Sequence, residues 1–308
     1  MMKKRAVVLY WTLIISLILI VSGWYLAAFL THGSDSESAG VIHTEFDGSR
    51  AYVDVQTQVD MGPRTPGSQG HAEVRKWIRN ELESAGWTVE IHESERLGHP
   101  IYNIIAKRND EPPQIILGAH YDTRFIADHD PDESKHGDPV PGANDGASGV
   151  AVLLELARSL PADIPPTWLV FFDKEDNGRI EGWDWILGSR AFADEISVSP
   201  RAVVIVDMIG DADLNIHYEG NSDIVIREEI WSAAAELGYG DIFIPTEKYN
   251  MLDDHTPFLE KGIPAVDIID FDYAYWHTTE DTPDKVSAES LKVVGDTLRH
   301  WLAAQGGE

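Results

Sequence analysis

The sequence contains no cysteine and is poor in basic residues: 24 Lys and Arg stand against 52 Asp and Glu, which gives a net charge of −28. Without cysteine the protein has no disulfide, no thiolate nucleophile and no sulfur ligand. Any metal must therefore be bound through His, Asp and Glu. The negative charge disfavours nucleic acid and anionic lipid as partners, because both are polyanions. We therefore expect no nucleic-acid partner.

Three common catalytic or nucleotide-binding loops are also missing. Ser189 lies in "LGSRAF", which lacks the Gly-x-Ser-x-Gly turn of a serine hydrolase nucleophile. The sequence has neither a Gly-x-x-x-x-Gly-Lys-Ser/Thr loop for phosphates nor a Gly-x-Gly-x-x-Gly loop for dinucleotides. A serine hydrolase with this turn and a nucleotide-binding enzyme with these loops therefore lack their signatures in the sequence.

The amino-terminal part contains the longest uncharged run, "AVVLYWTLIISLILIVSGWYLAAFL" at residues 6–30. It exceeds the roughly 20 residues of a membrane-spanning helix, so we predict a transmembrane signal-anchor there. The basic tip at residues 1–5 predicts a cytoplasmic amino terminus and an extracytoplasmic remainder of this single-pass membrane protein. A cleavable signal is the alternative, because Ala27 and Ala28 are small, but its apolar region usually spans only about 7–15 residues.

Beyond the anchor, a small polar stretch at residues 31–41 predicts a linker, and residues 42–308 predict one catalytic domain. Uninterrupted apolar runs such as "VVIV" (203–206) are typical of strands that are covered on both faces. We therefore predict a three-layer α/β/α domain with a mixed, mostly parallel central sheet. Strands are expected at 87–93, 102–108, 115–120, 167–173, 202–210, 214–220 and 265–270, and helices at 71–86, 147–160, 222–238, 256–262 and 287–304.

Acidic and histidine residues follow several of these strands, where open α/β sheets bind their ligands. His120 ends one strand, the pair Glu175 and Asp176 follows another, Asp207 lies in a third, and His277 comes after a fourth. Imidazole and carboxylate together form a donor set suited to zinc. The sequence thus places potential metal ligands and proton-transfer groups at one edge of the sheet.

Each of these residues also has a structural interpretation. His120 could belong to a surface pair with Asp122, Asp145 could cap the helix that follows it, and the charges around Glu175 could form a solvated loop. Asp207 could be a buried Asp satisfied by hydrogen bonds, and His277 could simply pack among aromatic residues. Taken singly, the segments leave these alternatives open.

Taken in order, however, the segments resemble the zinc exopeptidase-fold family, metallopeptidase family twenty-eight. The resemblance spans Ile42 to Leu302. This family contains aminopeptidases and glutaminyl-peptide cyclotransferases. Three further segments are closer to bacterial glutaminyl cyclases: the approach to Asp145, "GWDWILGSRAFA" and "DDHTPFLEKGIP". The shared segments are "GPRTPGSQGH", "GAHYDTR", "GANDGASGVAVLLELAR", "FFDKEDNG", "VDMIGD" and "WHTTEDTPD".

The resemblance implies a zinc aminopeptidase/phosphorylase-like domain with defined site residues. One zinc ion would be held by Asp145, Asp176 and His277. Many relatives have Glu-Glu where this chain has Glu175 followed by Asp176, which puts the metal geometry in question more than the catalysis. Glu175 would transfer the proton, and Asp207 and Asp254 would form a hydrogen-bonded network beside the metal. In a dinuclear enzyme, His120 and Asp207 would instead hold a second zinc ion. The pocket walls would come from Trp276, Trp183 and Trp185.

We therefore expect a membrane-anchored, zinc-dependent glutaminyl-peptide cyclotransferase, an acyltransferase that converts amino-terminal Gln of peptides or proteins into pyroglutamate and releases ammonia. The alternative is an aminopeptidase, a hydrolase of the same family with two zinc ions in place of one. A third hypothesis is a peptide-binding ectodomain without catalysis, against which the intact Glu175 argues. The sequence gives no expectation about the oligomeric state.

Overall fold

The computed structural model describes residues 45–306. The predicted basic tip (1–5), transmembrane anchor (6–30) and linker (31–41) lie outside the described residues. Within residues 45–306 no helix combines the length and the apolar composition that a membrane span needs.

The described domain is built on a six-stranded mixed sheet with the order β1-β2-β4-β3-β5-β8. The four strands β4, β3, β5 and β8 run parallel, whereas β1 and β2 are antiparallel neighbours at one edge. A separate parallel pair, β6 and β7, completes the strands. Their bounds are β1 (Thr88–Arg96), β2 (His99–Lys107), β3 (Ile115–His120), β4 (Thr167–Phe172), β5 (Ala202–Asp207), β6 (Ile216–Glu219), β7 (Phe243–Tyr249) and β8 (Ala265–Ile269).

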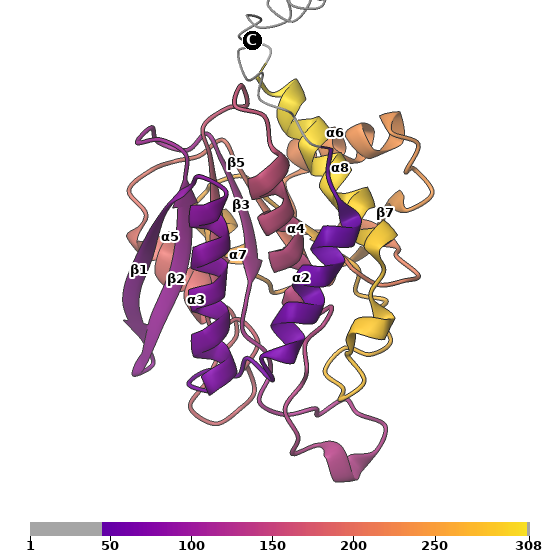
Figure 1. Cartoon of the computed structure of the whole chain (residues 1–308). Helices are drawn as coiled ribbons and strands as arrows, with labels where there is room; N and C mark the ends of the chain where they lie inside the picture. Colours follow the sequence, from indigo (N-terminus) through magenta and orange to yellow (C-terminus); the bar gives the residue numbers. More distant parts are fainter. Residues whose placement is uncertain (1–44, 307–308) are drawn as a thin grey trace, which may run out of the picture. The chain divides into compact units, whose positions relative to one another are not determined.

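Helices cover both faces of the sheet, which confirms the predicted three-layer architecture (Figure 1). Successive strand residues point to opposite faces: Leu169 and Phe171 join the larger core, and Val170 joins the smaller one. The larger core packs against α2 (Gly48–Asp60), α3 (Gln69–Ser84), α4 (Ala147–Ser159), α6 (Ile224–Glu236) and α8 (Ala288–Ala304), and the smaller one against α5 (Leu187–Glu195) and α7 (Thr256–Glu260).

Two helices and one strand were not predicted from the sequence. Helix α2 buries the small apolar residues Ala51 and Val55 together with the polar Gln58, so its apolar stripe is thin. Strand β7 contains Pro245, and most of its residues are exposed. The unpredicted helix α5 begins at Leu187, after the loop that carries Glu175 and Asp176, and its N-cap residue Ile186 has a left-handed backbone. These elements lack the strong periodicity on which sequence prediction depends.

A partly buried ionic cluster joins α2, α3 and α4. Arg158 of α4 donates to Asp54 of α2 and to Glu81 of α3, the latter at 2.8 Å, and Glu155 lies 3.5 Å away. The Glu155 side chain is fully buried and also pairs with Arg50. Because the paired groups come from three helices, they fix how these helices pack beside one another.

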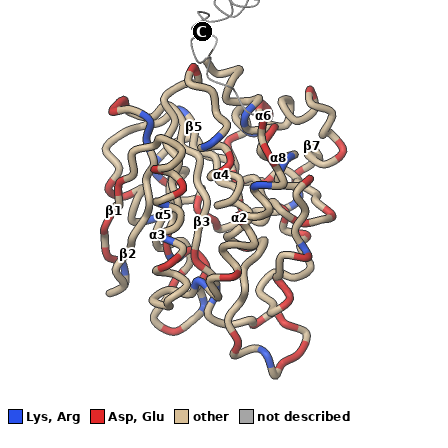
Figure 2. Tube along the Cα trace, viewed as in Figure 1, with Lys and Arg blue, Asp and Glu red and all other residues tan. Residues whose placement is uncertain are grey.

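Acidic residues occur in every part of the domain, and basic residues are scattered among them (Figure 2). They do not form one acidic face in this view; both colours follow helices, strands and loops alike. The negative charge therefore has a general solubilising role, apart from the acidic residues gathered at the site described next.

Candidate metal and active site

The carboxyl ends of the parallel strands bring the predicted site residues together. His120 is the last residue of β3, and Asp207 is the last residue of β5. Glu175 and Asp176 follow β4, and His277 lies in the loop after β8. Since these strands are parallel neighbours, their ends meet at one edge of the sheet. The sequence prediction of one convergent site agrees with this placement.

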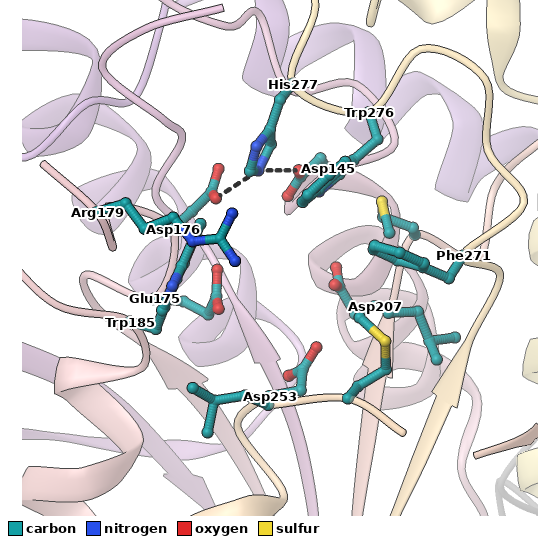
Figure 3. A pocket seen from close by; sticks show the side chains of 14 residues that line it. Asp145, Glu175, Asp176, Arg179, Trp185, Asp207, Asp253, Phe271, Trp276 and His277 are labelled. Atoms are coloured by element: carbon teal, nitrogen blue, oxygen red, sulfur yellow. Dashed lines mark hydrogen bonds and ion pairs between the residues drawn. The ribbon is translucent and has the colours of Figure 1, made fainter. Parts of the chain in front are cut away.

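Asp145, Asp176 and His277 form a compact set of donor atoms. Nε2 of His277 lies 2.8 Å from Oδ1 of Asp176 and 3.7 Å from Oδ2 of Asp145 (Figure 3). One donor atom from each of the three residues lies within 4.8 Å of the others. The second carboxylate oxygen of Asp176 is buried and has no hydrogen-bond partner. One imidazole and two carboxylates fit a zinc ion.

A second group adjoins the first and shares Asp145 with it. Nε2 of His120 lies 3.1 Å from Oδ1 of Asp145 and 3.2 Å from Oδ1 of Asp207. Asp145 therefore directs one oxygen to each histidine, as a carboxylate between two metal ions does. The residues fit either one ion or two.

Asp122 holds the loop that carries Glu175 and Asp176 in place. Its carboxylate accepts the backbone N–H of Glu175 at 2.9 Å and that of Asp176 at 3.4 Å. It also lies 3.6 Å from Nδ1 of His120, and its side chain is fully buried. The surface-pair interpretation of His120 and Asp122 is therefore wrong, because both side chains are inside the protein.

Asp145 is positioned by its neighbours and does not cap a helix. Helix α4 begins at Ala147 behind Gly146, and no side chain makes a capping hydrogen bond there. The backbone N–H of Asp145 donates to Asp281 at 3.1 Å, and the Tyr273 hydroxyl donates to the same carboxylate at 2.6 Å. Asp281 was not predicted as a site residue, although it lies in the quoted "WHTTEDTPD" segment.

An aromatic cavity of about 240 Å³ opens beside these donors. Trp185 and Trp276 flank His277, with ring centroids 5.9 and 3.8 Å from the imidazole. Trp183, the third predicted wall, does not line the cavity; it stacks on His99 instead, with centroids 3.7 Å apart. The lining residues are Asp145, Glu175, Asp176, Arg179, Trp185, Asp207, Met208, Met251, Leu252, Asp253, Ile269, Phe271, Trp276 and His277.

Of the adjacent acids Asp253 and Asp254, the structure places the first on the cavity wall. Asp254, predicted as part of the catalytic network, is fully buried and is not among the lining residues. Both of its carboxylate oxygens are buried without a hydrogen-bond partner. Adjacent residues in a loop point in different directions, and the sequence alone carries no signal to choose between the two acids.

The electrostatics separate the roles of the acids. Burial, together with the negative charges of Asp176 and Asp253, raises the pKa of Glu175 well above its usual range, although His120 opposes the shift. Burial likewise raises the pKa of Asp207 to about 7. Burial also opposes ionisation of Asp145, but the hydrogen bond and charge of His120 hold its pKa below the usual value. Asp145 is thus suited to bind a cation, and Glu175 to exchange a proton.

The chain is similar to known proteins in sequence and in fold. Residues 103–302 match peptidase family M28. The glutaminyl-peptide cyclotransferase of Boiga irregularis is 27% identical, over 82% of this chain and 82% of its own length. The glutaminyl cyclase of Bacteroides thetaiotaomicron, solved with N-acetylhistamine, superposes with a TM-score of 0.79 at 32% identity, over 84% of this chain and 98% of that one.

A Zn-dependent exopeptidase from Parabacteroides distasonis is similar to the same degree. Its structure gives a TM-score of 0.79 at 33% identity, over 86% of this chain and 99% of that one. The family predicted from the ordered sequence segments is therefore confirmed. The chain belongs to peptidase family M28, and it is an enzyme of the glutaminyl cyclase or peptidase type.

Proposed function

We propose that the protein is a zinc-dependent glutaminyl-peptide cyclotransferase, which converts the amino-terminal Gln of a peptide or protein into pyroglutamate and releases ammonia. The observation that carries the proposal is the buried Glu175 carboxyl group, which faces a small aromatic cavity beside a three-residue metal donor set. At about 240 Å³ the cavity is smaller than the roughly 300–1,000 Å³ of sites for drug-sized ligands, and it suits one amino-acid side chain. The glutaminyl cyclases among the similar proteins support the same reaction.

The residues of the cavity divide the chemistry among them. Zinc held by Asp145, Asp176 and His277 would supply a Lewis acid for the γ-carbonyl oxygen of the substrate glutamine. The α-amine of that glutamine attacks its own γ-carbon and forms the new C–N bond of the lactam ring. Glu175 accepts the proton that the amine loses and donates it to the departing amide nitrogen, which leaves as ammonia. The bond from the γ-carbon to that nitrogen breaks in the same sequence.

The proposed cyclisation needs a bound side chain but no external nucleophile. Trp185, Trp276 and Phe271 line the cavity next to the donor set and offer such a side chain an apolar surface to pack against. The attacking amine belongs to the substrate itself, which makes the reaction intramolecular and independent of an ordered water. An aminopeptidase, by contrast, must keep space for its nucleophilic water.

The second candidate, an aminopeptidase, is favoured by the group around His120. His120, Asp145 and Asp207 place their donor atoms within 4.8 Å of one another, which suits a second ion beside the first. Two ions would activate a water molecule, and Glu175 would serve as its base. In this alternative His120→Gln abolishes activity together with one metal equivalent, whereas in the cyclase the zinc content stays constant.

One experiment separates the two functions. Zinc-loaded full-length protein is incubated with a Gln-initiated peptide and with a Leu-initiated peptide of otherwise identical sequence, and the products are followed by mass spectrometry. The cyclase proposal expects loss of ammonia from the first peptide and no change in the second. Release of free leucine from the second peptide would refute the cyclase proposal and support the aminopeptidase.

We also propose that residues 6–30 anchor the enzyme in a membrane, with the catalytic domain on the extracytoplasmic side. The support is the length of the uncharged run and the basic residues that precede it. Washing membranes with alkaline carbonate tests the anchor, because a peripheral protein is released and an integral one is retained. Protease added to intact cells tests the orientation.

A further inference from the structure

The mouth of the reaction cavity carries a basic side chain that the proposed chemistry does not use. Among the described residues that line the cavity, Arg179 is the only Lys or Arg. Arg179 and Leu252 are the exposed members of the lining, whereas the others are buried or half-buried. These two side chains therefore lie where the cavity opens to solvent. Figure 3 shows the guanidinium of Arg179 reaching from the loop after β4 toward the labelled carboxylates.

The loop that leads to Arg179 is held in place by a second arginine. The guanidinium of Arg124 donates to the backbone carbonyls of Asp176 at 3.1 Å and Gly178 at 3.2 Å. The same guanidinium lies 4.9 Å from the centroid of the Trp185 ring, which is another wall of the cavity. The backbone from which Arg179 extends is thus fixed relative to that wall.

Arg179 itself adopts a left-handed backbone, with φ of 60°. This conformation is uncommon for a residue with a side chain, and glycine would adopt it without the steric cost. Within residues 45–306 the guanidinium of Arg179 forms neither an ion pair nor a hydrogen bond, whereas that of Arg124 pairs with Asp128 at 2.8 Å. The positive charge of Arg179 is therefore free to pair with a group of a bound ligand.

The size of the cavity determines which part of a peptide would meet this charge. At about 240 Å³ the cavity holds one amino-acid side chain, so the residue that follows the bound glutamine must lie at the mouth. The carboxylates that line the cavity are all buried, so a side chain at the mouth meets Arg179 before it meets them. A guanidinium offers a planar set of N–H donors that matches a carboxylate.

We propose that Arg179 selects peptides in which an acidic residue follows the amino-terminal glutamine. The proposal rests on the cyclase function, because that function places the glutamine side chain inside the cavity. The carboxylate of a Glu or Asp at the second position accepts hydrogen bonds from the Arg179 guanidinium while the glutamine is bound. A Lys or Arg at that position is disfavoured, because two positive charges would lie side by side.

The test compares three peptides that differ only at the second residue. Gln-Glu-Ala-Phe, Gln-Gln-Ala-Phe and Gln-Lys-Ala-Phe, each with an amidated carboxyl end, are incubated with zinc-loaded full-length protein, and ammonia release gives kcat/KM. We expect kcat/KM to decrease in the order Glu, Gln, Lys. Because an exposed ion pair contributes modestly, the first and last peptides should differ by roughly 3- to 10-fold. The difference should shrink at high salt, which screens exposed charges.

Two substitutions assign the selectivity to Arg179. Arg179→Ala should bring the kcat/KM values of the Glu and Lys peptides to within roughly twofold of each other, and Arg179→Glu should invert the order. The matched control is Arg79→Glu, which makes the same change of charge at an exposed position of α3 outside the cavity lining and should leave the order unchanged. This control accounts for the net charge of −28, which repels acidic peptides at long range. An unchanged order in Arg179→Glu, or an equal loss for all three peptides in Arg179→Ala, would overturn the proposal.

A binding measurement separates this proposal from the proposed reaction. Calorimetry with zinc-loaded Glu175→Gln protein measures the affinity for the same three peptides, and it does not depend on turnover. The order Glu, Gln, Lys in this variant, inverted when Arg179→Glu is added, would support the selectivity. Equal affinities would refute the selectivity and leave the reaction standing. If Leu-initiated peptides are hydrolysed instead, the cyclase function fails, and the same comparison with Leu-Glu, Leu-Gln and Leu-Lys peptides decides the role of Arg179.

Discussion

Replacing Glu175 with glutamine tests the proposed chemistry most directly. The amide has the size of the carboxyl group, so the metal donors and the roughly 240 Å³ cavity are retained. What is lost is the proton transfer, and general acid–base catalysis is worth about 10²- to 10⁴-fold. We therefore expect kcat to fall by that factor, a loss of about 3–5 kcal/mol of transition-state stabilisation, while KM and zinc content stay nearly constant.

The same substitution should stabilise the metal-free protein. Burial, and then the charge of Asp176, raise the pKa of Glu175 above its usual value in the folded state. A raised pKa means that the ionised carboxylate opposes folding, so stability is lost as the pH rises through the folded-state pKa. Glutamine does not ionise. In chelator at neutral pH the Glu175→Gln protein should unfold at a higher temperature than the wild type, and the difference should vanish at pH values below the usual carboxyl pKa.

Ammonia release measures kcat, and calorimetry of the chelated protein measures the unfolding temperature. Asp184→Asn is the matched control, because it makes the same carboxylate-to-amide change at an exposed position of a nearby loop. A Glu175→Gln enzyme that keeps kcat within a few-fold of the wild type would refute the role of this residue. If the chelated Glu175→Gln protein unfolds at a lower temperature than the chelated wild type at neutral pH, the electrostatic argument is wrong.

Three further predictions concern stability, the cavity wall and the metal. Arg158→Met should reduce the free energy of unfolding by about 3–5 kcal/mol, because it leaves the buried carboxylates of Asp54 and Glu155 without this partner. Denaturant titration measures the loss. The control Arg79→Met breaks an exposed ion pair and should reduce the free energy of unfolding by less than about 1 kcal/mol. Gly178→Ala should raise KM several-fold, because the added Cβ would lie 2.2 Å from the Trp185 ring, whereas Gly137→Ala, with open space around it, should leave KM unchanged. Dialysis against a chelator should abolish turnover until zinc is returned; full activity in chelator would exclude a metal-dependent reaction.

The parts of the fold that could be predicted from the sequence are those with a strong apolar pattern. The runs at β3 and β5 are buried along their length, β4 is buried except at Trp168, and α3 places Val74, Ile78 and Leu82 on one face. Helix α2 was missed because its buried face includes the polar residues Asp54 and Gln58. Asp54 accepts from Arg158 of α4, and Gln58 donates to the backbone carbonyl of Ala147 in α4 as well as to that of Asp54. Such polar burial depends on partners that are distant in the chain.

By itself, the sequence determined the chemical types at the site: a cysteine-free set of carboxylates and imidazoles at strand ends, in an order that identifies the family. Tertiary structure decided which of these groups face the same space. It selected Asp253 over Asp254 and Trp185 over Trp183 for the cavity wall, and it shared Asp145 between two histidines. The physical reason is that a loop residue's direction is set by packing and hydrogen bonds from other elements, whereas sequence order fixes only the strand end to which the residue is attached.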